Sequence, residues 1–370
     1  MSTLTTRRTA LRNLLQVGMG AAALPLLGTR HAFGGGSASQ CPGADTGISW
    51  VPDVMHPVAA GFEDLGVSDG APGPVRVWYP TAELEVVGRP AKFLNHCTAR
   101  WPVVLFLHGQ QPCPDTQPRN PDYFKSWTHI PAQLARSGYV VLVPAHPQDL
   151  SLSTAEALRL SGFIDWARTS WQNALSLDQR PEAVAIAGHS RGAVHAAFVA
   201  QVRGEVSAFV SLGGVWDSLA NDTEEMLAVL DKPTFFEWVP GVFQEDLDGG
   251  HRWDQLNITK YACMYPGEHF DYIDMPAGCN EPVGPCRVVK LASADLVTLF
   301  LSRYLPVAAS RTRIQLSLLP PDVPLTDPKQ LQFATRRLEG LDRINRVHGC
   351  SMDLRFRSGL IGGTVHFGGQ

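Results

Sequence analysis

The segment Ala183-Val184-Ala185-Ile186-Ala187-Gly188-His189-Ser190-Arg191-Gly192 joins a short apolar run to a pentapeptide of the form Gly-x-Ser-x-Gly. The apolar run has the length and composition of a strand that is buried on both faces. Residues 193–202, rich in Ala and Val and free of Gly and Pro, are expected to form a helix. The segment therefore predicts a strand, a sharp turn at Ser190 and a helix, which is one unit of an α/β architecture.

The same alternation of strands and helices extends in both directions along the chain. Further strands are expected at 75–80, 103–107, 139–143, 208–212, 234–236 and 261–265. Further helices are expected before Gly138, from the capping-box sequence at 153–156 onward, and over 288–304. This order predicts an α/β fold with a mostly parallel sheet and helices on both faces.

Three regions are expected along the chain. Residues 1–39 are interpreted as an export signal with a linker, residues 40–305 as the α/β domain, and residues 306–370 as a C-terminal extension of unknown role. Within that extension, segments 353–357 and 364–367 are expected to pair as strands.

The first 34 residues carry the features of an export signal. They contain four Arg and no acidic residue, and the pair Arg7-Arg8 precedes a short apolar stretch that ends at Leu27. This stretch is too short to span a bilayer, and the paired Arg resembles a twin-arginine signal. We therefore expect the protein to be exported to the periplasm or the extracellular space.

Composition excludes several classes of protein. The 370 residues are 44% hydrophobic and 18% charged, which is typical of a globular chain. The net charge of −4 becomes −8 once the four N-terminal Arg are set aside, so no nucleic-acid partner is expected. No later run reaches the ~18 apolar residues that a membrane span needs.

Seven cysteines are consistent with an oxidising destination. Cys279 and Cys286 share a Pro/Gly-rich loop where a local disulfide is expected, and Cys97 with Cys113 is a second candidate pair. Cys263 lies in an apolar run and is interpreted as a buried thiol. No Cys-x2-Cys or His-x3-His pair supports zinc, so no metal and no cofactor are implied.

Ser190 is the candidate nucleophile. A strand-to-helix turn lifts its hydroxyl clear of the sheet, the flanking glycines allow close backbone approach, and the helix N-terminus favours negative charge beside it. The alternative is a tight turn in which Ser190 only caps the helix. The sequence His108-Gly109-Gln110, at the end of an earlier buried strand, predicts that the backbone N–H groups of Gln110 and Arg191 form an oxyanion hole.

His269 is the candidate general base. It follows the predicted strand 261–265, late in the chain, where a base can reach the serine. His251 is a competitor in a Gly-rich loop, whereas His189 is expected to pack behind Ser190.

The acid of the triad is expected between Ser190 and His269. Asp217, after strand 208–212, is the best single candidate, and Asp246 is the main alternative. Glu245 and Asp248 belong to the same later cluster as Asp246, whereas Glu237 is expected inside a strand.

With these motifs, roughly residues 60–305 resemble the α/β-hydrolase family. The segment Arg76-Val77-Trp78-Tyr79-Pro80, the His108-Gly109 pair and 188–192 are similar to esterases of the platelet-activating-factor acetylhydrolase-like, chlorophyllase-like and polyester-hydrolase-like groups. The first group places its acid after the earlier strand, which favours Asp217, and the last group places it after the later one. The chain departs from both, with Gly213-Gly214 and Val239-Pro240-Gly241 at the expected acid positions.

These features together predict a secreted serine hydrolase that cleaves carboxylic esters through a Ser-His-Asp triad and an acyl-enzyme. The expected substrate is a small-molecule, lipid or polyester-like ester. The alternatives are an amidase or peptidase on the same scaffold, and a catalytically silent binding protein with this fold.

Overall fold

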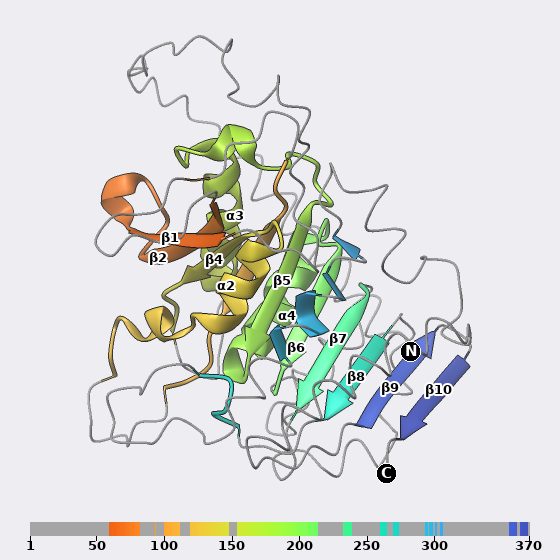
Figure 1. Cartoon of the computed structure of the whole chain (residues 1–370). Helices are drawn as coiled ribbons and strands as arrows, with labels where there is room; N and C mark the ends of the chain where they lie inside the picture. Colours follow the sequence, from red (N-terminus) through yellow and green to blue (C-terminus); the bar gives the residue numbers. More distant parts are fainter. Residues whose placement is uncertain are drawn as a thin grey trace, which may run out of the picture. The chain divides into compact units, whose positions relative to one another are not determined.

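One sheet of ten strands, in the order β1-β2-β4-β3-β5-β6-β7-β8-β9-β10, forms the centre of the computed structural model (Figure 1). Its strands are β1 (Ala59–Leu65), β2 (Val75–Thr81), β3 (Val103–Leu107), β4 (Val140–Pro144), β5 (Val184–His189), β6 (Ala208–Leu212), β7 (Thr234–Trp238), β8 (Lys260–Met264), β9 (Arg355–Leu360) and β10 (Gly363–Gly368). The structure describes residues 59–81, 93, 100–111, 119–147, 154–213, 232–238, 260–264, 269–273, 293–294, 296–298, 300–301, 304–305, 355–360 and 363–368.

The six central strands, from β4 across to β8, are all parallel. Every residue of β3, β4 and β6 is buried, as expected for apolar runs covered on both faces. The predicted bounds of β3 and β6 are confirmed, and those of β4, β5, β7 and β8 differ from the prediction by one or two residues. The mostly parallel sheet inferred from the sequence is therefore correct.

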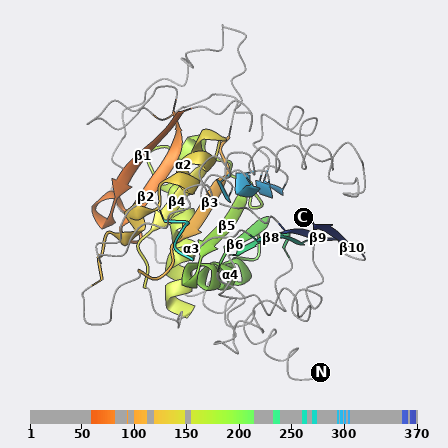
Figure 2. The same ribbon diagram turned by 60° about the horizontal axis from the view of Figure 1, so that its bottom comes forward.

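Helices cover both faces of the sheet. Helix α3 (Thr154–Thr169) and helix α4 (Arg191–Arg203) pack on one face, and α2 (His129–Arg136) packs on the other, as Figure 2 shows. The sheet face on which α2 packs is also covered by the described residues from 293 to 304. These residues are helical and include the buried Val297 and Phe300. The late helix expected over 288–304 is thus confirmed where the structure describes it.

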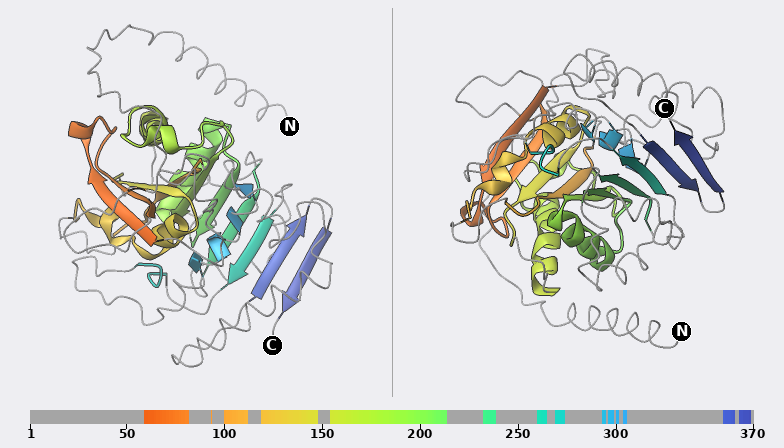
Figure 3. Two further views of the ribbon diagram at one scale, coloured as in Figure 1. Left: turned by 45° about the horizontal axis from the view of Figure 1, so that its top comes forward. Right: turned by 90° about the horizontal axis from the view of Figure 1, so that it is seen from below.

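Antiparallel strands extend the sheet at both edges. Strand β1, which sequence patterning missed, pairs with β2, and β2 pairs antiparallel with β4. At the other edge, β9 pairs antiparallel with β8, and β10 completes a hairpin (Figure 3). The two strands expected in the C-terminal extension do form, and they continue the main sheet.

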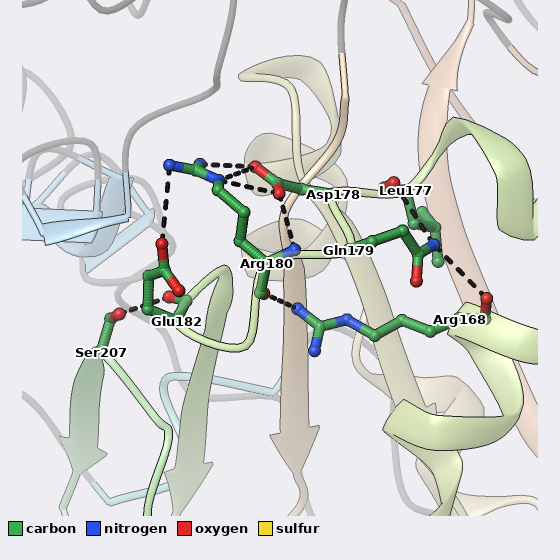
Figure 4. Close-up of polar contacts among 7 residues, drawn as sticks. All are labelled: Arg168, Leu177, Asp178, Gln179, Arg180, Glu182 and Ser207. Atoms are coloured by element: carbon green, nitrogen blue, oxygen red, sulfur yellow. Dashed lines mark hydrogen bonds and ion pairs between the residues drawn. The ribbon is translucent and has the colours of Figure 1, made fainter.

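A polar turn holds the N-terminal end of β5 (Figure 4). The Asp178 side chain is only 4% exposed, and its carboxylate accepts a hydrogen bond of 2.5 Å from Nη2 of Arg180. Nη2 of Arg168 in turn donates to the carbonyl oxygen of Arg180 at 2.6 Å. Burial raises the pKa of Asp178, but hydrogen bonds from Arg180 outweigh burial and leave this pKa below its usual value. This turn fixes the end of β5 that lies opposite Ser190.

The strand order, the antiparallel β2 beside β4, and the passage from β5 through Ser190 into α4 define an α/β-hydrolase fold. Within the described part of the chain, no helix is long and apolar enough to cross a membrane. The expected export signal and the two candidate disulfides lie outside the described residues.

Candidate active site

Ser190 occupies a strained turn between β5 and α4. Its backbone has φ 55° and ψ −127°, and it is the one non-glycine residue with positive φ among the described residues. Such a conformation costs on the order of 1–3 kcal/mol and is retained where the surrounding structure imposes it. Although Ser190 stands at the N-cap position of α4, its side chain makes no capping hydrogen bond. The side-chain cap that the alternative interpretation of Ser190 requires is therefore not formed.

The two glycines of the motif are required by close backbone packing. A Cβ atom at position 188 would lie 2.2 Å from the carbonyl oxygen of Gly192. A Cβ atom at position 192 would lie 2.2 Å from the carbonyl oxygens of both Leu107 and His108. Any larger residue would push α4 away from the end of β3, so the glycines set how closely the turn approaches the loop after β3.

The loop after β3 lies directly against the turn. A Cβ atom at position 109 would lie 2.9 Å from the Cβ atom of Ser190 and 2.8 Å from Nδ1 of His189. The half-buried Gln110 follows Gly109, and its carbonyl oxygen lies 3.5 Å from the hydroxyl of the buried Tyr123. The structure thus brings the predicted oxyanion segment to the candidate nucleophile, where the N–H of Arg191 begins α4.

His269 lies beside the same turn and is half-buried. Its ring centroid is 4.7 Å from that of His189, and its carbonyl oxygen accepts a hydrogen bond of 3.0 Å from Nε2 of His189. The Nδ1 atom of His269 faces Gly213, the residue that follows β6. The predicted base is thus joined to the nucleophile turn across 80 residues of sequence.

The structure describes only one of the candidate acids, Glu237. Asp217, the cluster of Glu245, Asp246 and Asp248, and the competitor His251 lie outside the described residues. Glu237 is inside β7, as the sequence predicted, and is 1% exposed. Its carbonyl oxygen accepts a hydrogen bond from the backbone N–H of Gly213.

Three buried histidines, whose grouping the sequence did not indicate, lie together at the oxyanion loop. His108 follows β3, His146 follows β4 and His195 lies in α4. The rings of His108 and His146 stack at 4.0 Å, and Nδ1 of His146 lies 3.3 Å from Nδ1 of His195. Local patterns could not reveal this cluster, because each imidazole comes from a different element.

Burial keeps two of these imidazoles, those of His108 and His146, neutral. Burial lowers the pKa of His108 to about 4, and it lowers the pKa of His146 well below the usual value, with further lowering from His108 and His195. Neutral His108 donates through Nδ1 to the carbonyl oxygen of Gly109 at 2.8 Å, since a carbonyl oxygen only accepts. Among the described residues, no group of three or more His, Cys, Asp or Glu is arranged to hold a metal ion.

The site therefore combines a strained serine, an adjacent imidazole and a loop of backbone N–H groups. These are the parts that acyl transfer from a serine requires.

No protein-family model matches the chain, and no curated protein matches it. A ferulic acid esterase from Streptomyces cinnamoneus, solved at 2.4 Å resolution, is a similar structure. The two share 18% sequence identity with a TM-score of 0.45, over 63% of this chain and 82% of that chain.

Proposed function

We propose that the protein is a serine hydrolase that cleaves carboxylic esters. The observation that carries this proposal is Ser190, which is held at φ 55° on a strand-to-helix turn while its side chain makes no helix-capping bond. A fold maintains such strain where the side chain has to be presented in one direction. The adjacent His269 and the 108–110 loop support the same reaction class.

In the proposed mechanism, His269 takes the proton of the Ser190 hydroxyl while the serine oxygen attacks the ester carbonyl carbon. The backbone N–H groups of Gln110 and Arg191 hold the oxyanion of the tetrahedral intermediate. The intermediate collapses, and the alcohol leaves with the proton from His269. Water then attacks the acyl-enzyme with His269 again as base, which releases the acid and restores Ser190.

We assign the acid to Asp217, as in the acetylhydrolase-like esterases that the chain resembles. The Nδ1 atom of His269 faces the carboxyl end of β6, and Asp217 follows that end four residues after Gly213. A carboxylate in this place would hold the Nδ1–H tautomer and leave Nε2 free to take the serine proton.

The proposal extends to substrate and location. The substrate is a small-molecule, lipid or polyester-like carboxylic ester, and the protein acts after export through its twin-arginine-like signal. Cys279 and Cys286 form a disulfide there.

The proposed function is tested by turnover of p-nitrophenyl acetate and of the matching p-nitroanilide. Ser190→Ala should abolish ester cleavage, and His269→Ala should reduce it to a similar extent because the serine proton then has no acceptor. Ser207→Ala is the matched control, because that hydroxyl donates to the carbonyl oxygen of Glu182 at the far end of the sheet. Faster cleavage of the anilide would make the protein an amidase, and unchanged turnover in Ser190→Ala would refute the proposal.

A further inference from the structure

His189 contacts all three segments of the candidate site. Its Nε2 donates to the carbonyl oxygen of His269 at 3.0 Å, and its Nδ1 faces Gly109, where a Cβ atom would lie 2.8 Å away. Its backbone belongs to the nucleophile turn itself. The base loop, the oxyanion loop and the nucleophile thus meet on one imidazole ring.

The ring of His189 is fixed in place. It is fully buried, at 0% exposure, and it packs against the rings of Trp127 at 4.8 Å and Tyr272 at 5.1 Å. A carbonyl oxygen only accepts hydrogen bonds, so the hydrogen bond to His269 requires the tautomer with the proton on Nε2. The other nitrogen, Nδ1, is buried without a hydrogen-bond partner.

The ring also stays uncharged. Burial lowers the pKa of His189 well below its usual value, and the nearby His269 lowers it further. A neutral His189 leaves His269 free to become the cation during proton transfer, because no second positive charge stands beside it.

We infer that His189 is a positioning residue, whose Nε2–H holds the backbone of the base loop in register with Ser190. This inference rests on the proposed function, since it assigns His189 a part in the same reaction. The hydrogen bond joins two short segments that are far apart in the sequence, and a base displaced by about 1 Å loses on the order of 100-fold in rate. Because the His189 side chain is fully buried, we expect its substitution to leave binding of the ester unaffected.

The test compares two substitutions of similar size. Gln places an amide N–H near the position of Nε2, whereas Met fills the same volume without a donor. Active sites are counted by titration with a fluorophosphonate, and kcat and KM for p-nitrophenyl acetate are measured per titrated site. We expect His189→Met to lower kcat about 10- to 100-fold with KM unchanged, and His189→Gln to keep kcat within about threefold of the wild type.

A third variant covers failure of His189→Met to fold. His189→Asn carries its amide nearer to the position of Nδ1, so it should fall below His189→Gln by at least about tenfold in kcat. Equal kcat per titrated site in all three variants would overturn the inference, as would a loss confined to KM or to the number of active sites. A wild-type protein that neither reacts with the fluorophosphonate nor turns over the ester would instead refute the proposed function.

Discussion

The Nδ1 edge of His269 faces Gly213, so that a Cβ atom at position 213 would lie 3.3 Å from Nδ1 and 3.4 Å from Cε1. Gly213 follows β6 directly and has φ +61°. This contact places the base at the carboxyl end of β6, the strand next to β5, which ends at His189 just before Ser190. It also leads to two predictions about the catalytic machinery.

The first prediction concerns Gly213→Ala, with Gly204→Ala as its matched control. Both glycines have positive φ, so each alanine should lower the free energy of unfolding by about 1–2 kcal/mol. Only position 213 would press a methyl group on His269, because a Cβ atom at position 204 meets nothing within 4 Å. Esterase kinetics should show kcat about 10- to 100-fold lower in Gly213→Ala and unchanged in Gly204→Ala. Equal kcat values in the two variants would contradict this contact.

The second prediction concerns the triad acid. Asp217→Asn should lower kcat by on the order of 10⁴, because the amide cannot hold the Nδ1–H tautomer of His269. Asp246→Asn should leave kcat near the wild-type value. The reverse order in steady-state kinetics would move the acid to the cluster after β7, and near-normal rates in both variants would exclude Asp217.

The sequence predicted the central fold well, for a physical reason. Strands β3 and β6 are buried on both faces, so every position is apolar or small and the bounds are readable. Strand β1 was missed because Ala59-Ala60-Gly61-Phe62-Glu63-Asp64-Leu65 has no clear alternation, and its position depends on pairing with β2. The placement of the C-terminal hairpin beside β8 is also tertiary information that no local pattern carries.

The candidate site was predicted in part. The Gly-x-Ser-x-Gly motif and its flanking elements indicated Ser190, and the expected packing of His189 behind it is confirmed. The hydrogen bond from His189 to the carbonyl oxygen of His269 could not be inferred, because the acceptor is a backbone atom on a distant loop. The contact of Gly213 with the ring of His269 could not be inferred either, because the two residues are 56 positions apart and meet only in the folded chain.

The third prediction concerns stability against pH. The folded pKa values of the buried His108 and His146 lie below their unfolded values, so the unfolded chain binds more protons below pH ~6.5. The free energy of unfolding should therefore fall as pH drops. For His108, whose pKa falls from 6.5 to about 4, the loss amounts to about 3 kcal/mol and is complete near pH 4. Urea titrations at a series of pH values between 7.5 and 4.5 measure the slope of the free energy of unfolding against pH.

Two carboxyl groups also contribute to the pH dependence of the free energy of unfolding. Glu63 opposes the trend, because burial raises its pKa and its protonation favours the folded state as pH falls. Asp178 adds to the loss only at more acidic pH, because its folded pKa lies below the usual value. His146→Asn should give a shallower slope than the wild type, and a stability that is constant from pH 7.5 to 4.5 would contradict the prediction.

The fourth prediction concerns the polar turn before β5. Arg180→Gln leaves the buried carboxylate of Asp178 without its ion partner and should lower the free energy of unfolding by about 2 kcal/mol. Glu182→Gln is the matched control, because its ion pair with Arg180 is long, at 3.8 Å, and its side chain is 61% exposed. Thermal unfolding should show a clearly lower melting temperature for Arg180→Gln and almost no change for Glu182→Gln. Both should keep normal kcat per titrated site, and a catalytic defect in either would contradict the separation of this turn from the site.

The fifth prediction concerns the nucleophile, and its measurement is covalent labelling of the folded protein with a fluorophosphonate, followed by mass spectrometry of its peptides. The reagent phosphonylates a serine whose proton is removed by a neighbouring base. We predict one adduct per chain, located on Ser190, and its loss in Ser190→Ala with the fold intact by circular dichroism. A folded wild-type protein in which Ser190 remains unmodified would contradict its assignment as the nucleophile of a serine hydrolase.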